Sequence, residues 1–213
     1  MALLQPSEYD ISYFDGKLAS LSHNAGYTTY NRLYHSGTNN FDLMAVDILN
    51  RYTVGNKRAL EICSAKGFLV ADLRTRGINA FGVDVSQYAY DQADPSVQPY
   101  LTVADIRIGQ STFLEDFNNN YFALILGMNC LCCFSDAEIT AMVTELNRIS
   151  SDQFYVITEN APTTFYNSKT IQEWRDGFSW QQGTVFVKSD KFNQYVNSNG
   201  QKTLTINVDF VVK

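Results

Sequence analysis

The chain has 213 residues, enough for one domain with a substantial hydrophobic core. Hydrophobic residues make up 45% of the chain and charged residues 18%, a composition typical of globular domains. The formal net charge of −6 argues against nucleic acid or an anionic membrane as a partner, because phosphate binding relies on clustered lysine and arginine.

Two further observations concern location. No apolar run approaches the roughly 20 residues that span a bilayer. The N-terminal sequence, MALLQPSEYD, has neither a basic region nor a long apolar core, so it predicts no signal peptide. We therefore expect a cytoplasmic protein that does not act in a membrane.

Residues 1–40 are rich in aromatic side chains and show no regular periodicity. The rings are distributed among polar residues and glycines, at Tyr9, Tyr13, Phe14, Tyr27, Tyr30 and Tyr34. Segments of this kind carry function more often than core. The alternative is that the rings merely pack the segment against the domain.

A helix is expected next, over residues 41–52. Its apolar residues recur with the 3.6-residue period of one helix face, at Phe41, Ala45, Ile48, Leu49 and Tyr52.

The stretch 58–86 contains the most informative pattern. An apolar run at 59–63 ends in a turn of small residues at 64–67, and a helical segment follows that Gly77 closes. A second apolar run then ends on Asp84. This order of strand, tight turn, helix, strand and acid predicts the opening βαβ unit of a nucleotide-binding α/β fold.

The chemistry of such a unit is specific. A turn of small residues lets a ligand approach the backbone, and the next helix directs free N–H groups at it. Asp84 follows Gly67 by 17 positions, near the roughly 20 expected for a carboxylate that accepts the hydroxyls of a ribose. The alternative is an α/β unit that binds no nucleotide.

These residues resemble the first two motifs of class I S-adenosylmethionine-dependent methyltransferases. The closest branch has a first motif of leucine, glutamate, any residue, glycine, cysteine, alanine, lysine, glycine, phenylalanine and leucine. The chain has LEICSAKGFL at 60–69, GVDVS at 82–86 and PYLTVADI at 99–106. One position departs from the family, because Cys63 stands where glycine is usual and its side chain would crowd the amino-acid end of the cofactor.

The resemblance implies a Rossmann-like three-layer α/β/α sandwich with a seven-stranded, mostly parallel sheet. Late strands joined without a helix favour an antiparallel C-terminal edge. We expect a single methyltransferase-like domain over 1–213, with 1–40 as a lid or substrate-entrance segment.

Further elements are expected after Asp84. They are a short helix capped by Ser86 and ending near Ala93, strands at 101–104 and 121–128, a short helix at 111–117, a helix opened by a capping box at 135–138, a strand at 154–158, a helix at 169–178, a strand at 184–187, a turn at 199–200 and a strand at 203–212.

The resemblance also implies S-adenosylmethionine as cofactor. Asp84 would bind the ribose, Asp105 the adenine amino group, and Ile106 the adenine face. The full set of expected cofactor-binding residues is Tyr27, Glu61, Cys63, Ser64, Ala65, Gly67, Asp84, Val85, Ala104, Asp105, Ile106, Gly127 and Met128.

Three of the four cysteines, Cys130, Cys132 and Cys133, lie at the end of an expected strand. A zinc site would need paired ligands with suitable spacing and a second pair elsewhere. The two histidines, His23 and His35, supply no such pair. We therefore expect no metal, and we interpret the cysteines as buried free thiols.

The methyl acceptor is not identified by the sequence, and we expect a small molecule or an exposed side chain. Many relatives carry an acid–histidine pair where this chain has Leu131-Cys132-Cys133. The weak candidates for a general base are His23, His35, Tyr27 and Glu159.

Three other functions stay open. A catalytically silent cofactor-binding subunit is suggested by Cys63 and by the missing acid–histidine pair. An enzyme on the same fold that cleaves S-adenosylmethionine is another alternative. An NAD-linked oxidoreductase is disfavoured because the G-x-G-x-x-G pattern is absent.

Overall fold

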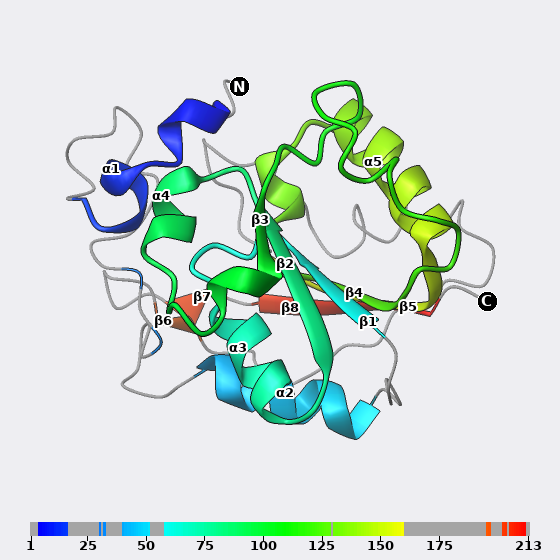
Figure 1. Cartoon of the computed structure of the whole chain (residues 1–213), viewed down its shortest axis with the longest axis horizontal. Helices are drawn as coiled ribbons and strands as arrows, with labels where there is room; N and C mark the ends of the chain where they lie inside the picture. The colour runs from blue at the N-terminus through cyan, green and yellow to red at the C-terminus, as the bar shows by residue number, and fades with distance from the viewer. Residues whose placement is uncertain are drawn as a thin grey trace.

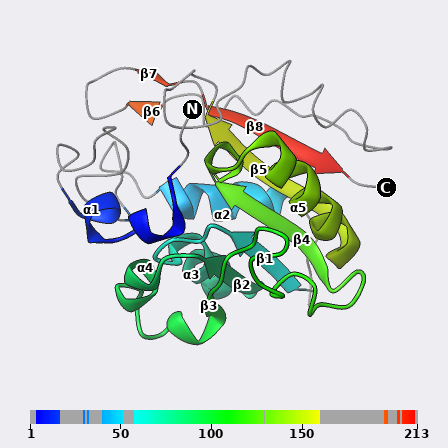
Figure 2. The same ribbon diagram turned by 90° about the horizontal axis from the view of Figure 1, so that it is seen from above.

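A six-stranded sheet lies at the centre of the computed structural model, with strand order β3-β2-β1-β4-β5-β8 (Figures 1 and 2). The structure describes residues 4–16, 30, 32, 40–51, 58–128, 130–159, 195–196, 202–203 and 205–211. The strands are β1 (Arg58–Ile62), β2 (Asn79–Asp84), β3 (Leu101–Val103), β4 (Phe122–Met128), β5 (Ser150–Glu159) and β8 (Thr205–Val211); β6 (Tyr195–Val196) and β7 (Lys202–Thr203) form a separate pair. The helices are η1 (Pro6–Glu8), α1 (Ile11–Phe14), α2 (Asn40–Arg51), α3 (Phe68–Thr75), α4 (Gln87–Asp91), η3 (Gln98–Tyr100), η4 (Leu131–Cys133) and α5 (Asp136–Ile149).

The sheet is parallel from β3 through β5. Ile62 at the end of β1 pairs with Val83 of β2 and with Gly127 of β4, so these three strands end at the same edge. Ligands of open α/β sheets bind outside this carboxyl edge. The parallel α/β fold predicted from the βαβ pattern is therefore confirmed.

At the other side of the sheet, β8 pairs antiparallel with β5, in a register that places Phe210 opposite Phe154. Six strands form this sheet in the described part of the chain. The strand expected at 184–187 lies outside the described residues, as do the helix expected at 169–178 and the turn at 199–200.

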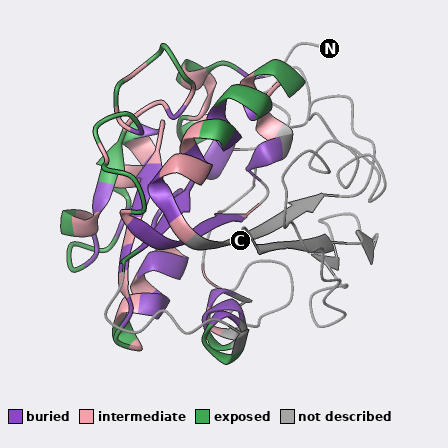
Figure 3. Ribbon diagram, turned by 90° about the vertical axis from the view of Figure 1, so that its right-hand side faces the viewer, coloured by how far each residue is buried: buried purple, intermediate pink, exposed green. Residues whose placement is uncertain are grey.

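The helices form two layers, one on each face of the sheet. Helices α2 and α3 cover one face and α5 covers the other, as Figure 1 shows. Two buried clusters lie between the sheet and these layers, and a third joins the N-terminal segment to α4 and the β1–α3 turn (Figure 3). Period-2 alternation along β1 produces this division, because Ala59 faces the α2–α3 layer whereas Leu60 and Ile62 face α5.

The predicted capping box of α5 is confirmed. The Ser135 Oγ accepts a hydrogen bond from the Glu138 N–H at 3.3 Å, and a Glu138 carboxylate oxygen accepts from the Ser135 N–H at 2.8 Å. The helix buries the five apolar residues expected of it, Ile139, Met142, Val143, Leu146 and Ile149. The Ser86 cap of α4 is also present, with the Ala89 N–H at 3.0 Å from the Ser86 Oγ.

Two local predictions are wrong. Residues 111–117 form bends and turns instead of a helix. The Ser111 hydroxyl donates to the Asp105 carbonyl at 2.5 Å, and such side-chain bonds to the backbone compete with helix formation. In α2, Leu49 was expected on the same face as Phe41, Ala45 and Ile48 but is 37% exposed, whereas Met44 is fully buried.

Within the described residues, no helix is long and apolar enough to cross a membrane.

Candidate functional site

The turn from β1 into α3 forms one wall of the site. Its backbone is left-handed at Cys63 (φ 54°), Ala65 (φ 49°) and Gly67 (φ 71°). A Cβ at Gly67 would lie 2.8 Å from Cδ1 of Leu101, which would have to shift, and the positive φ makes any residue with a side chain strained there. The turn thus brings its backbone close to the carboxyl edge of the sheet.

Asp84, the last residue of β2, fixes this turn. One of its carboxylate oxygens accepts from the Ala65 N–H at 2.8 Å, and the other accepts from the Ser86 N–H at 2.9 Å. Burial raises the pKa of Asp84 above its ordinary value, and the backbone N–H groups of Ser86, Ala65 and Val85 offset part of that rise. The carboxylate therefore joins two turns at the edge where a ligand would bind.

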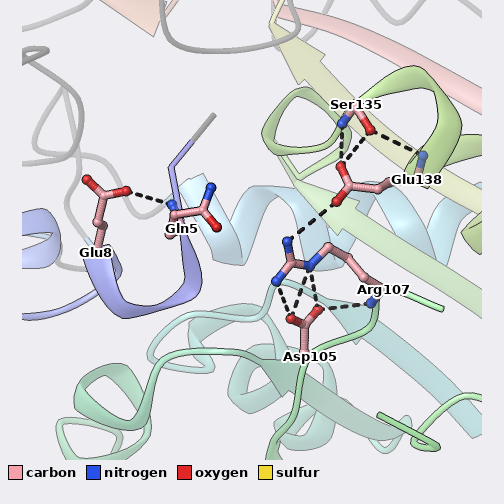
Figure 4. Close-up of polar contacts among 6 residues, drawn as sticks. All are labelled: Gln5, Glu8, Asp105, Arg107, Ser135 and Glu138. Atoms are coloured by element: carbon pink, nitrogen blue, oxygen red, sulfur yellow. Dashed lines mark hydrogen bonds and ion pairs between the residues drawn. The ribbon is translucent and has the colours of Figure 1, made fainter. Parts of the chain in front are cut away.

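A second acid, Asp105, follows β3 and is paired with Arg107 (Figure 4). The Arg107 guanidinium donates to both carboxylate oxygens of Asp105 at 2.5–3.0 Å and reaches Glu138 of α5 at 3.4 Å. Burial acts to raise the pKa of Asp105, but the hydrogen bonds and charge of Arg107 outweigh it and hold that pKa below its ordinary value. Arg107 thereby connects the end of β3 to the start of α5.

The N-terminal segment lies against the same edge. Lys66 of the β1–α3 turn bonds to Asp15 at 2.5 Å, and Asp15 also accepts from the Tyr88 hydroxyl at 2.8 Å. The Ser86 hydroxyl donates to the Tyr9 carbonyl at 2.5 Å. The segment is therefore bound to both turns that Asp84 joins.

The contact between Asp15 and Lys66 is expected to stabilise the fold measurably. The Lys66 side chain is only 9% exposed, so Asp15→Asn leaves a buried ammonium without its counter-ion. We expect a loss of about 1–3 kcal/mol in the free energy of unfolding, measured by urea denaturation. In a double-mutant cycle, Lys66→Met added to Asp15→Asn should cost less than the sum of the two single changes; additive costs would contradict the coupling.

These elements enclose a cavity of about 800 Å³, including its mouth. Its lining is mostly apolar and aromatic, with Asp84, Asp105 and Arg107 as the charged members. The described lining residues are Leu4, Pro6, Tyr9, Tyr13, Phe14, Tyr30, Cys63, Ala65, Val83, Asp84, Val85, Ala104, Asp105, Ile106, Arg107, Met128, Cys133 and Phe134.

The structure brings most of the sequence-predicted cofactor residues to this cavity. Those that line it are Cys63, Ala65, Asp84, Val85, Ala104, Asp105, Ile106 and Met128. Four others lie in the same strands and turn but are not in the lining: Glu61, Ser64, Gly67 and Gly127. Tyr27, His23 and His35 lie outside the described residues, and Glu159 is the last residue of β5.

Sequence reasoning did not assign several lining residues. Arg107 lies two positions after Asp105, and that spacing was the available signal for an ion pair at the strand end. Leu4 and Pro6 precede the aromatic residues noted in the first 40 positions. Cys133 and Phe134 follow β4 and reach the cavity through η4.

The expectation of free thiols is wrong for two of the cysteines. Cys63 and Cys130 form a disulfide, with their Cα atoms 5.7 Å apart. They follow β1 and β4, which are hydrogen-bonded neighbours, so the sheet brings together residues 67 positions apart. In the described part of the chain, no group of three or more histidine, cysteine, aspartate or glutamate side chains is arranged to hold a metal ion.

Glu61 lies beneath the β1–α3 turn and is only 3% exposed. Its carboxylate accepts from the Val70 N–H, but its Oε2 has no hydrogen-bond partner among the described residues. Burial raises the pKa of Glu61 well above its ordinary value, and the nearby charge of Asp84 raises it further. A buried carboxylate oxygen of this kind fits a ligand that brings a donor.

Comparisons with known proteins agree on the fold. No protein-family model and no curated protein sequence matches the chain. Among solved structures, magnesium protoporphyrin IX methyltransferase from Synechocystis, with bound S-adenosylmethionine, is similar at a TM-score of 0.59 and 13% identity, over 82% of this chain and 78% of that one. The PH0226 protein of Pyrococcus horikoshii is similar at a TM-score of 0.64 and 14% identity, over 88% of this chain and 96% of that one. A SAM-dependent methyltransferase from Archaeoglobus fulgidus is similar at a TM-score of 0.59 and 10% identity, over 80% of this chain and 94% of that one.

The chain therefore has the fold of class I S-adenosylmethionine-dependent methyltransferases, as the sequence motifs indicated.

Proposed function

We propose that the protein is a transferase that binds S-adenosylmethionine in this cavity and transfers its methyl group to a small molecule or an exposed side chain. The observation that carries the proposal is the placement of Asp84. Its carboxylate lies in the cavity wall, at the end of β2, and is joined to the left-handed β1–α3 turn. One neighbour on the same fold, magnesium protoporphyrin IX methyltransferase, has structures with bound S-adenosylmethionine and with bound S-adenosylhomocysteine, which supports this choice of ligand.

The residues present fit the three parts of the cofactor. Asp84 would accept hydrogen bonds from the ribose hydroxyls, and Ile106 would contact the adenine ring. Glu61, whose Oε2 has no described partner, would accept a hydrogen bond from the ammonium of the amino-acid part. Asp105 would accept from the adenine amino group only if Arg107 gave up one of its bonds to that carboxylate, because the guanidinium and the Arg107 N–H occupy both oxygens.

S-adenosylmethionine supplies an activated methyl group, so the protein mainly orients the acceptor in line with it. The apolar part of the lining, with Tyr9, Tyr13, Phe14 and Phe134, would exclude water from that position. A base is needed only for an acceptor that must lose a proton. His23, His35, Tyr27 and Glu159 stay the candidates for that role.

Calorimetric titration tests the proposal. We expect binding of S-adenosylmethionine and S-adenosylhomocysteine and no binding of NAD. Incubation with cell-extract small molecules should yield S-adenosylhomocysteine, whereas methylthioadenosine would show cleavage of the cofactor instead of methyl transfer. Binding of NAD alone would contradict the proposal.

A catalytically silent cofactor-binding subunit is the second candidate. Cys63 favours it, because a side chain occupies a left-handed position in the cavity wall. Such a subunit would bind S-adenosylmethionine and form no product with any acceptor. Product formation above the rate without protein would exclude it.

A further inference from the structure

We propose that the Cys63–Cys130 disulfide is a thiol–disulfide exchange site, through which a small thiol reductant weakens cofactor binding. The proposal deepens the proposed function and rests on it. It assigns a role to the cysteines at the ends of β1 and β4, which the methyl-transfer chemistry does not use.

The two cysteines differ in access. Cys63 is partly exposed and lines the cavity, whereas Cys130 is fully buried in the core between the sheet and α5. A small thiolate that enters the cavity therefore reaches Cys63 first. A cofactor that fills the cavity would cover the same sulfur and protect it.

The exchange balances in two steps. A thiolate attacks the Cys63 sulfur, the bond to Cys130 breaks, and Cys130 leaves as a thiolate that takes up a proton. A second thiolate then attacks the mixed disulfide on the side of the small molecule and releases Cys63. Two small thiols are oxidised to one disulfide, and the protein gains two thiol groups.

Backbone conformation explains how the bond would affect the cofactor. Cys63 is held at φ 54°, a region that residues with a side chain rarely adopt. The disulfide ties this residue to the loop after β4. Once the bond is reduced, Cys63 is free to return to an ordinary φ. That change would shift the adjoining turn and weaken the hydrogen bond from the Ala65 N–H to Asp84.

Three variants separate the bond from the conformation. Cys130→Ser and Cys63→Ser both remove the disulfide and keep a side chain at position 63, so each should bind like the reduced protein. Cys63→Gly also removes the disulfide, but glycine adopts a positive φ without strain. It should therefore bind S-adenosylmethionine more tightly than Cys63→Ser does.

The experiment compares oxidised and dithiothreitol-reduced protein. Reduction should add two titratable thiols, speed hydrogen exchange over residues 63–67, and weaken S-adenosylmethionine binding by about tenfold. Saturating S-adenosylhomocysteine should slow the appearance of the thiols. Cys63→Gly should bind with an affinity that dithiothreitol does not change.

Four results would overturn the proposal: an unchanged thiol count after reduction, equal affinity of the oxidised and reduced proteins, tight binding by Cys130→Ser, or binding by a folded Cys63→Gly that is no tighter than that of Cys63→Ser. Failure of every form to bind S-adenosylmethionine would overturn the proposed function. In that case the thiol count and the hydrogen exchange, which need no ligand, would still support the exchange site.

Discussion

Asp84→Ala is expected to weaken S-adenosylmethionine binding by roughly tenfold to a hundredfold. A hydrogen bond to a charged group contributes about 1.5–3 kcal/mol, and about 1.4 kcal/mol corresponds to a factor of ten. The substitution also removes the carboxylate that joins the Ala65 and Ser86 turns, so the loss should fall at the upper end of this range. Calorimetric titration measures it.

Asp91→Ala is the matched control. Asp91 is an exposed carboxylate on α4 that does not line the cavity, so its removal changes the net charge equally. Its affinity should equal that of the wild type. Thermal unfolding of both variants separates loss of the site from loss of the fold, and unchanged affinity in folded Asp84→Ala would contradict the assignment of the ribose to Asp84.

Local patterns predicted the elements that local interactions determine. The capping box at Ser135 and Glu138 lies within one turn of helix, and the apolar period of α5 repeats over a few residues. The β1–α3 turn was predictable because small residues and glycine mark tight turns, and glycine tolerates backbone dihedrals that most residues avoid. Because β1, β2 and β3 are parallel, Cys63, Asp84 and Asp105 lie together at the carboxyl edge of the sheet.

Contacts between distant segments were not predictable from such patterns. Arg107 and Glu138 are 31 positions apart, and Asp15 and Lys66 are 51 positions apart. Their pairing depends on how the connecting segments fold over the sheet. The spacing of apolar residues along the sequence contains no information about that. The disulfide was missed for a related reason, because the pairing of β1 with β4 becomes known only when the strand order is known.

Glu61→Gln should change stability and cofactor affinity in opposite directions. The folded-state pKa of Glu61 lies well above the ordinary value, mainly because of burial. The contribution of Glu61 to the free energy of unfolding is therefore fully present below its unfolded pKa of about 4.3. It is lost as the pH rises through the folded pKa. Glutamine carries no charge at any pH, so the variant should unfold at a higher temperature than the wild type at pH 7, with the difference vanishing near pH 4.

The affinity for S-adenosylmethionine should fall in Glu61→Gln, although the stability rises. If Glu61 accepts a hydrogen bond from the cofactor's ammonium, its charge contributes to affinity, and the glutamine variant should bind S-adenosylmethionine roughly tenfold less tightly. Glu138→Gln is the matched control, because it is the same chemical change at a carboxylate whose hydrogen-bond partners, Ser135 and Arg107, are already in place. Burial acts to raise the pKa of Glu138, but hydrogen bonds from Ser135 and the charge of Arg107 lower it overall, so its stability contribution is present above the unfolded pKa and lost in acid. Glu138→Gln should therefore destabilise the protein at pH 7 and leave affinity nearly unchanged. A Glu61→Gln variant that is less stable at pH 7 and binds normally would show that Glu61 supports the fold and does not contact the cofactor.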